Sequence, residues 1–146
     1  MREQTFVKTQ QGFSLLEIMV VLVIIGLLAT TVGPRVFSML AKGYETRIVQ
    51  DFSTIKTALT TYKVENFIFP TTEQGLEALV SEPESDPRPK NWSGYLDKLP
   101  RDPWQNPYQY LSPADGRPFD VYTLGADGQP GGVDENADIS IWDDKE

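Results

Sequence analysis

Hydrophobic residues fill an unbroken stretch near the start of the chain. Residues 13–33 read FSLLEIMVVLVIIGLLATTVG and contain a single charged residue, Glu17. At about 1.5 Å per residue, this stretch forms a helix roughly 30 Å long, which is the thickness of a bilayer core. The pattern therefore predicts a membrane-spanning helix.

From Arg35 onward the hydrophobic positions take a helical spacing. Gly26, Gly33 and Pro34 weaken a helix locally, but they do not require it to end. We predict one long helix over residues 13–65, in which 13–34 is apolar on every side and 35–65 is amphipathic. The residues expected on its buried face, where they pack into the core of a small domain, are Phe37, Leu40, Tyr44, Ile48, Phe52, Ile55, Leu59 and Tyr62.

Residues 66–146 predict a small globular head, because turn-forming residues separate short apolar runs. The expected fold is α+β: a long amino-terminal helix packed on a small antiparallel sheet. The expected elements after that helix are a short helix at 71–80 capped by Thr71 or Thr72, a loop at 81–89, a helical turn at 91–96, a hairpin of strands at 108–111 and 119–124, and a third strand at 139–142.

The composition narrows the chemistry that the chain can perform. It has no cysteine and no histidine, so thiol catalysis, thiolate zinc sites and histidine bases are excluded. The net charge is −8, and residues 115–146 alone carry −7. Nucleic acid is therefore a poor partner, whereas a hard cation is a good one. A head this small, without disulfides, is expected to gain stability from a metal or from self-association.

The first 12 residues, MREQTFVKTQQG, are polar and slightly basic, which favours a cytoplasmic location for this end. The run Gly12-Phe13-Ser14-Leu15-Leu16-Glu17 resembles the processing motif of the type IV pilin-like proteins. That resemblance implies that a prepilin peptidase removes residues 1–12 as a leader by cutting after Gly12. It also implies that the new amino-terminal residue, Phe13, is N-methylated.

Glu17 stands alone in a membrane-spanning stretch, where an unpaired carboxylate costs several kcal/mol. The free amine of Phe13 in a neighbouring subunit is an obvious partner. Such a pair would set the axial register of a helical fibre. We expect Phe13, Glu17 and Pro34 to be the assembly residues.

A second informative segment lies near the carboxyl end, at residues 124–138. Its glycines allow tight turns, and its acidic residues could bring several oxygen atoms together. This chemistry suits Ca²⁺, although the spacing does not match an EF-hand loop. On composition alone, both a calcium site and a solvated acidic turn remain open.

Longer motifs are similar to those of the major pseudopilins of type II secretion systems, the general secretion pathway protein G family. They are Leu99–Trp104, Asn106–Tyr110, Asp120–Gly128, Gly131-Gly132 and Ala137–Ile139. The resemblance implies a structural calcium ion bound by the side chains of Asp127, Asp134 and Asn136 and by the carbonyls of Leu124 and Gly132. Glu135 and Asp138 are further candidate ligands, although Asp138 could instead accept a hydrogen bond from the loop backbone.

The resemblance also implies a function that is structural rather than enzymatic. The chain would polymerise through its amino-terminal helix into a pseudopilus that drives export of folded proteins across the outer membrane. Its partners would be copies of itself, minor pseudopilins, the prepilin peptidase and an inner-membrane assembly platform. It would sit in the inner membrane of a Gram-negative bacterium by a single span, with the head in the periplasm.

Two other functions stay open on the residues alone. One is the major subunit of a type IV pilus for adhesion or motility, although many such pilins carry a carboxy-terminal disulfide that this chain cannot form. The other is a membrane-anchored periplasmic enzyme that uses Asp143-Asp144 or Asp134-Glu135 as acid and base. Adjacent carboxylates are more often solvated charge.

Overall fold

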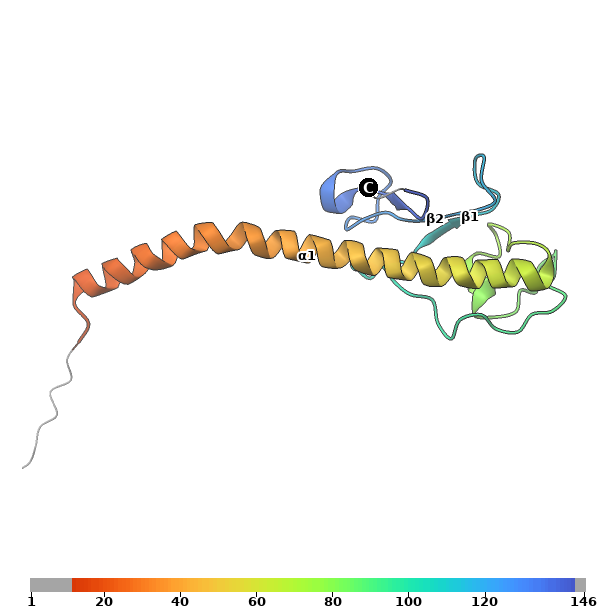
Figure 1. Cartoon of the computed structure of the whole chain (residues 1–146), viewed down its shortest axis with the longest axis horizontal. Coiled ribbons are helices and arrows are strands. Elements are labelled where there is room, and N and C mark those ends of the chain that lie inside the picture. Colours follow the sequence, from red (N-terminus) through yellow and green to blue (C-terminus); the bar gives the residue numbers. More distant parts are fainter. Residues whose placement is uncertain (1–11, 144–146) are drawn as a thin grey trace, which may run out of the picture. The chain divides into compact units, whose positions relative to one another are not determined.

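The structure, a computed structural model, describes residues 12–143 (Figure 1). Of the predicted leader, residues 1–11 therefore lie outside the described residues. The elements in chain order are α1 (Leu15–Asn66), η1 (Leu76–Leu79), β1 (Gln109–Leu111), β2 (Asp120–Thr123), η2 (Asp134–Asn136) and β3 (Ile139–Ser140). One long helix and a small antiparallel sheet confirm the predicted α+β class. The chain divides into two compact units, one ending at Leu40 and the other beginning at Ala41.

The first unit holds the amino-terminal part of α1. Large apolar side chains between Leu15 and Leu28 are 45–81% exposed. Both Gly26 and Pro34 lie inside the bounds of α1, so neither residue ends the helix. Within residues 12–143, α1 is the helix long and apolar enough to cross a membrane.

The second unit is the head, and α1 supplies much of its core. Ile48, Ile55, Leu59 and Tyr62 are at most 1% exposed, and Phe52 is 6% exposed. The predicted stripe is therefore correct from Ile48 onward. Phe37 and Leu40, which belong to the first unit, are exposed instead. Tyr44 is half-buried, with its ring edge-on to Trp104 at 5.5 Å.

The end of α1 falls one residue later than predicted. Phe67 follows with a φ of 65°, a left-handed conformation that turns the chain away from the helix axis. Its N–H donates to the carbonyl of Lys63 at 2.8 Å, and the Lys63 ammonium group donates to the Phe67 carbonyl. These bonds satisfy backbone groups that a helix terminus leaves unpaired.

The described part of the head contains a three-stranded antiparallel sheet in the order β1-β2-β3. Tyr110 pairs with Val121 between β1 and β2, and Thr123 pairs with Ile139 between β2 and β3. Alternate residues of these strands face the core, so Tyr110, Val121 and Thr123 are buried. The predicted hairpin and third strand are confirmed, although each strand is shorter than expected.

Two helical predictions need correction. The expected helix at 71–80 is a turn followed by the short 3-10 helix η1, because Gly75 adopts a φ of 65° just before it. Thr71 does cap that turn, since its hydroxyl accepts the Gln74 N–H at 3.2 Å.

The expected helical turn at 91–96 is wrong. This segment is a loop whose N–H groups at Tyr95 and Leu96 both donate to the carbonyl of Leu79. Gly94 has a φ of 74°, which lies outside the right-handed helical region, so a helical turn cannot run through it.

Candidate functional site

The start of α1 presents the predicted processing site. Gly12 and Phe13 precede the helix, and the Phe13 side chain is 79% exposed. The Ser14 hydroxyl oxygen accepts the backbone N–H of Glu17 at 3.2 Å, so Ser14 caps the helix. Sequence reasoning missed this cap, although Ser14 and Glu17 have the spacing of a capping box. The side chain of Glu17 is exposed in the first turn.

The loop from Leu124 to Asp138 leaves β2 and returns at β3, and two glycines let it close on itself. Gly125 is buried with a φ of 68°, and a side chain there would place its Cβ 2.6 Å from the carbonyl carbon of Asn136. Gly132, with a φ of 98°, would place a Cβ 2.4 Å from the carbonyl oxygen of the same Asn136. The backbone of Asn136 therefore lies directly against both glycines, and it leaves no room for a side chain at either position.

Hydrogen bonds connect the two sides of the loop. The Ala126 N–H donates to the Glu135 carbonyl at 2.8 Å. The Gly131 N–H donates to the Asp138 carboxylate at 2.9 Å, which is the alternative role expected for Asp138. These hydrogen bonds hold the two sides of the loop together.

The structure brings two of the predicted ligands into contact. Gly132 and Asn136 are in contact, and Asp134 begins η2 with a φ of 53°. The Asp127 carboxylate accepts the Gln129 N–H at 3.0 Å, within its own turn. The side chains of Asp127 and Asp134 are exposed, so both retain free oxygen lone pairs.

These donors fit a hard cation by their chemistry, because carboxylate, amide and carbonyl oxygens are the ligands that Ca²⁺ prefers. Between residues 12 and 143, no three Asp, Glu, His or Cys side chains gather closely enough to hold a metal by themselves. A cation in the loop would therefore depend on main-chain oxygens as much as on the carboxylates of Asp127 and Asp134.

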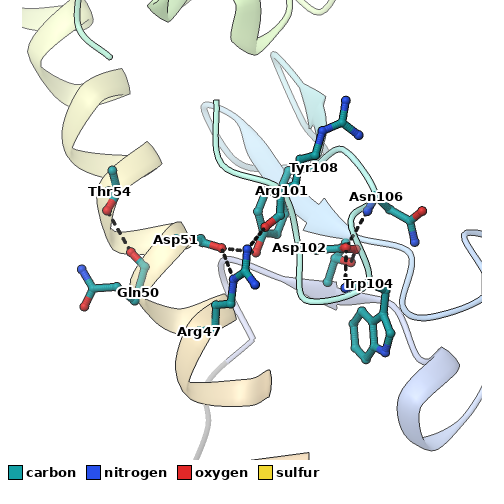
Figure 2. Close-up of polar contacts among 10 residues, drawn as sticks. Arg47, Gln50, Asp51, Thr54, Arg101, Asp102, Trp104, Asn106 and Tyr108 are labelled. Atoms are coloured by element: carbon teal, nitrogen blue, oxygen red, sulfur yellow. Dashed lines mark hydrogen bonds and ion pairs between the residues drawn. The ribbon is translucent and has the colours of Figure 1, made fainter. Parts of the chain in front are cut away.

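A buried acidic residue near the loop was not predicted from the sequence. Asp102 is fully buried, and its Oδ1 accepts the N–H groups of Trp104 at 3.0 Å and Asn106 at 2.7 Å (Figure 2). Its Oδ2 accepts the hydroxyl of Thr123 at 2.7 Å. In the sequence, Asp102 stands out only as part of the motif Leu99–Trp104, because its partner Thr123 is distant in the chain.

Two further hydrogen bonds join the segment from Arg101 to Tyr108 to α1. The Tyr108 hydroxyl donates to the Asp51 carboxylate at 2.9 Å, and Arg47 donates to the carbonyl of Arg101 at 3.1 Å (Figure 2). Burial, with a further contribution from the Asp51 carboxylate, raises the pKa of Tyr108 far above its usual value. Tyr108 therefore stays a neutral donor at physiological pH.

An exposed apolar helix preceded by a processing motif, joined to a small α+β head, defines the chain as a type IV pilin-like subunit. Comparison with known proteins agrees with this class. The prokaryotic N-terminal methylation motif matches residues 7–33, and the family described as type II secretion system protein G matches residues 35–142.

Individual relatives support the same family. The chain is 54% identical over 138 residues to the type II secretion system core protein G of Pseudomonas aeruginosa, covering 93% of this chain and 97% of the relative. It is 50% identical over 137 residues to the type II secretion system core protein G of Vibrio cholerae, covering 92% of this chain and 93% of the relative. It also resembles the crystal structure of the major pseudopilin from the type 2 secretion system of enterohaemorrhagic Escherichia coli. The TM-score is 0.62 at 39% identity, over 69% of this chain and 88% of that one.

The chain therefore belongs to the type II secretion system protein G family, the major pseudopilins. The alternative of a long adhesive or motility pilus is not favoured by these matches.

Proposed function

We propose that the chain is the main structural subunit of a type II secretion pseudopilus. The observation that carries this proposal is the exposed apolar surface of α1 between Leu15 and Leu28, in a chain of the protein G family. Apolar surface of this extent is stable only when lipid or other protein covers it. Lipid would cover it before assembly, and the helices of neighbouring copies would cover it in the fibre.

Assembly depends on the processed end of the chain. Cleavage between Gly12 and Phe13 would create a free amine, and methylation of Phe13 would modify it. That amine would pair with Glu17 of the adjacent copy, which neutralises a carboxylate that is costly in an apolar environment. Pro34, inside α1, would adjust the helix for packing within the fibre.

The loop from Leu124 to Asp138 would bind one structural Ca²⁺. Asp127 and Asp134 would supply charge, and Asn136, Leu124 and Gly132 would supply neutral oxygens. Glu135 remains a further candidate ligand. An ion bound only by the folded head stabilises it by mass action, and it offsets repulsion among the clustered carboxylates.

The remaining partners and the topology follow from the same proposal. A single span would place the head in the periplasm of a Gram-negative bacterium, and a prepilin peptidase would process the cytoplasmic leader. Minor pseudopilins would occupy the fibre with this subunit, and an inner-membrane platform would assemble it. The described residues are proposed to act as a scaffold, with no catalytic role.

The deciding experiment compares two variants in a secreting bacterium that lacks the native subunit. Glu17→Leu removes the carboxylate but keeps the backbone N–H that Ser14 caps. Ser14→Ala removes the cap but keeps the carboxylate. We expect Glu17→Leu to be inserted into the membrane and cleaved, but not to form fibres or support secretion. Ser14→Ala should form fibres and support secretion. Normal fibres and secretion from Glu17→Leu would refute the register role.

A further inference from the structure

We propose that Asp102, Asn106 and Thr123 form a clamp that fixes Gly125 and thereby orients the Leu124 carbonyl towards the cation of the loop. This inference rests on the calcium site proposed above. It assigns positioning roles to three residues that are not among the expected ligands.

Asp102 organises the clamp from a fully buried position. Its two carboxyl oxygens accept three hydrogen bonds, two from backbone N–H groups in its own turn and one from the Thr123 hydroxyl at the end of β2. The carbonyl of Asn106 in turn accepts the N–H of Asp102 at 3.0 Å. The turn and the strand end are therefore held in one hydrogen-bonded group.

Both polar backbone groups of Gly125 are bonded to this group. Its N–H donates to the Thr123 hydroxyl oxygen at 3.2 Å, and its carbonyl accepts the Asn106 side-chain amide at 3.0 Å. A hydroxyl has one proton, and that of Thr123 is donated to Asp102. The lone pairs of the Thr123 oxygen are therefore turned towards Gly125.

The link to the ion is the planarity of the peptide bond. The Gly125 N–H and the Leu124 carbonyl belong to one peptide unit, in which they point in opposite directions. Holding the N–H on Thr123 consequently fixes the direction of the Leu124 carbonyl oxygen, an expected ligand.

The clamp also acts on the opposite side of the loop. Gly125 is buried against Asn136, another expected ligand, and the next residue, Ala126, bonds the Glu135 carbonyl. Fixing Gly125 therefore limits the movement of two ligand positions, Leu124 and Asn136. Ordering these oxygens before the ion arrives reduces the entropy lost on binding.

The test uses the full-length chain purified in detergent and four variants. Asn106→Ala deletes the bond to the Gly125 carbonyl, and Thr123→Val deletes the hydroxyl with little change in volume. Thr123→Ser keeps the hydroxyl. Asn91→Ala is the matched control, because the Asn91 amide also donates to a backbone carbonyl, that of Glu65 at 3.2 Å, away from the loop.

Two quantities are measured: the Ca²⁺ dissociation constant by titration calorimetry, and amide hydrogen exchange of the calcium-free chains. We expect Asn106→Ala and Thr123→Val to weaken Ca²⁺ binding about tenfold or more, the range seen when partners of metal ligands are removed. Thr123→Ser and Asn91→Ala should stay within about twofold of the parent chain. Without calcium, exchange in Asn106→Ala should rise at Gly125 and Ala126 but not in β1, whereas a loss of overall stability would raise it in both.

Each outcome decides between the proposals. An unchanged dissociation constant in Thr123→Val overturns the orientation of the Leu124 carbonyl. Exchange at Gly125 and Ala126 that is unchanged in calcium-free Asn106→Ala overturns the clamp. If the parent chain binds no Ca²⁺, the calcium site and the orienting role both fail. Exchange in the calcium-free chains then shows whether the clamp still orders the loop.

Discussion

Replacing Trp142 by Phe should lower the free energy of unfolding of the head by about 2 kcal/mol. The indole N–H of Trp142 donates to the Phe119 carbonyl at 2.8 Å, and its ring lies 5.4 Å from the Phe119 ring. The Lys56 ammonium lies 4.5 Å and the Arg117 guanidinium 5.6 Å from the Trp142 ring. Loss of the hydrogen bond costs about 1 kcal/mol, and weaker cation–π contacts with less apolar burial cost about 1 kcal/mol more.

Urea and thermal unfolding, followed by circular dichroism, would measure this loss. A decrease of about 2 kcal/mol should lower the melting temperature by roughly 10 °C for a domain of this size. A double-mutant cycle of Trp142→Phe with Lys56→Met isolates the contact with the lysine, and we expect a coupling of about 0.5 kcal/mol. Lys42→Met, another exposed lysine of α1, serves as the control and should show no coupling to Trp142.

Unchanged stability of Trp142→Phe would refute this reasoning, because the indole hydrogen bond and both cation contacts would then contribute nothing measurable. A loss in stability without coupling to Lys56 would refute the cation–π part alone.

Three further predictions concern the processing site, the loop and a buried tyrosine. Replacing Gly12 by a bulky residue should leave the leader attached, because the peptidase would no longer accept the bond before Phe13; a band at the mature size on a gel would contradict this. Excess chelator should lower the melting temperature of the head, since the acidic loop loses its counter-ion, and added Ca²⁺ should restore it; the same melting temperature in all three conditions would exclude a structural ion. Burial raises the pKa of Tyr110 from 10.0 to about 12. The unfolded chain therefore loses this proton first, and the contribution of Tyr110 to stability is complete below about pH 10 and falls as the pH rises towards 12. Tyr110→Phe should remove part of that alkaline loss in a pH series of urea unfolding, and an identical pH dependence in both chains would contradict the assignment.

The long helix and the sheet could be predicted from the sequence because their signals are local and periodic. The spacing from Ile48 to Tyr62 identifies a buried face, and the structure buries those residues. Phe37 and Leu40 have the same spacing but are exposed, because spacing alone does not show which residues of an apolar face are covered.

The polar interactions of the head were harder to predict. The role of Asp102 depends on Thr123, which lies 21 residues further on in another element. No local pattern connects the two, so only the fold brings them together. The cap formed by Ser14 is different, since the spacing of Ser14 and Glu17 is a recognised local signal and could have been used.

The error at residues 91–96 has a similar physical origin. A segment of six residues is too short to form a stable helix of its own, and its conformation is decided by its partners. Here the Leu79 carbonyl accepts two N–H groups of the segment, and the Trp92 indole donates to the Ala78 carbonyl at 2.8 Å. Both accepting carbonyls belong to η1, so the sequence of the segment itself does not reveal them.

The packing of Trp142 on Lys56 joins two segments that are far apart in the chain. Lys56 lies on α1, the first element of the described chain, whereas Trp142 follows β3, its last strand. β3 pairs only with β2, so the sheet is complete only after residues 139 and 140 have emerged. Contacts between such distant segments must wait for the intervening chain, and they slow folding. In the proposed topology, the head would therefore cross the membrane unfolded and reach its final structure only after translocation of its last strand.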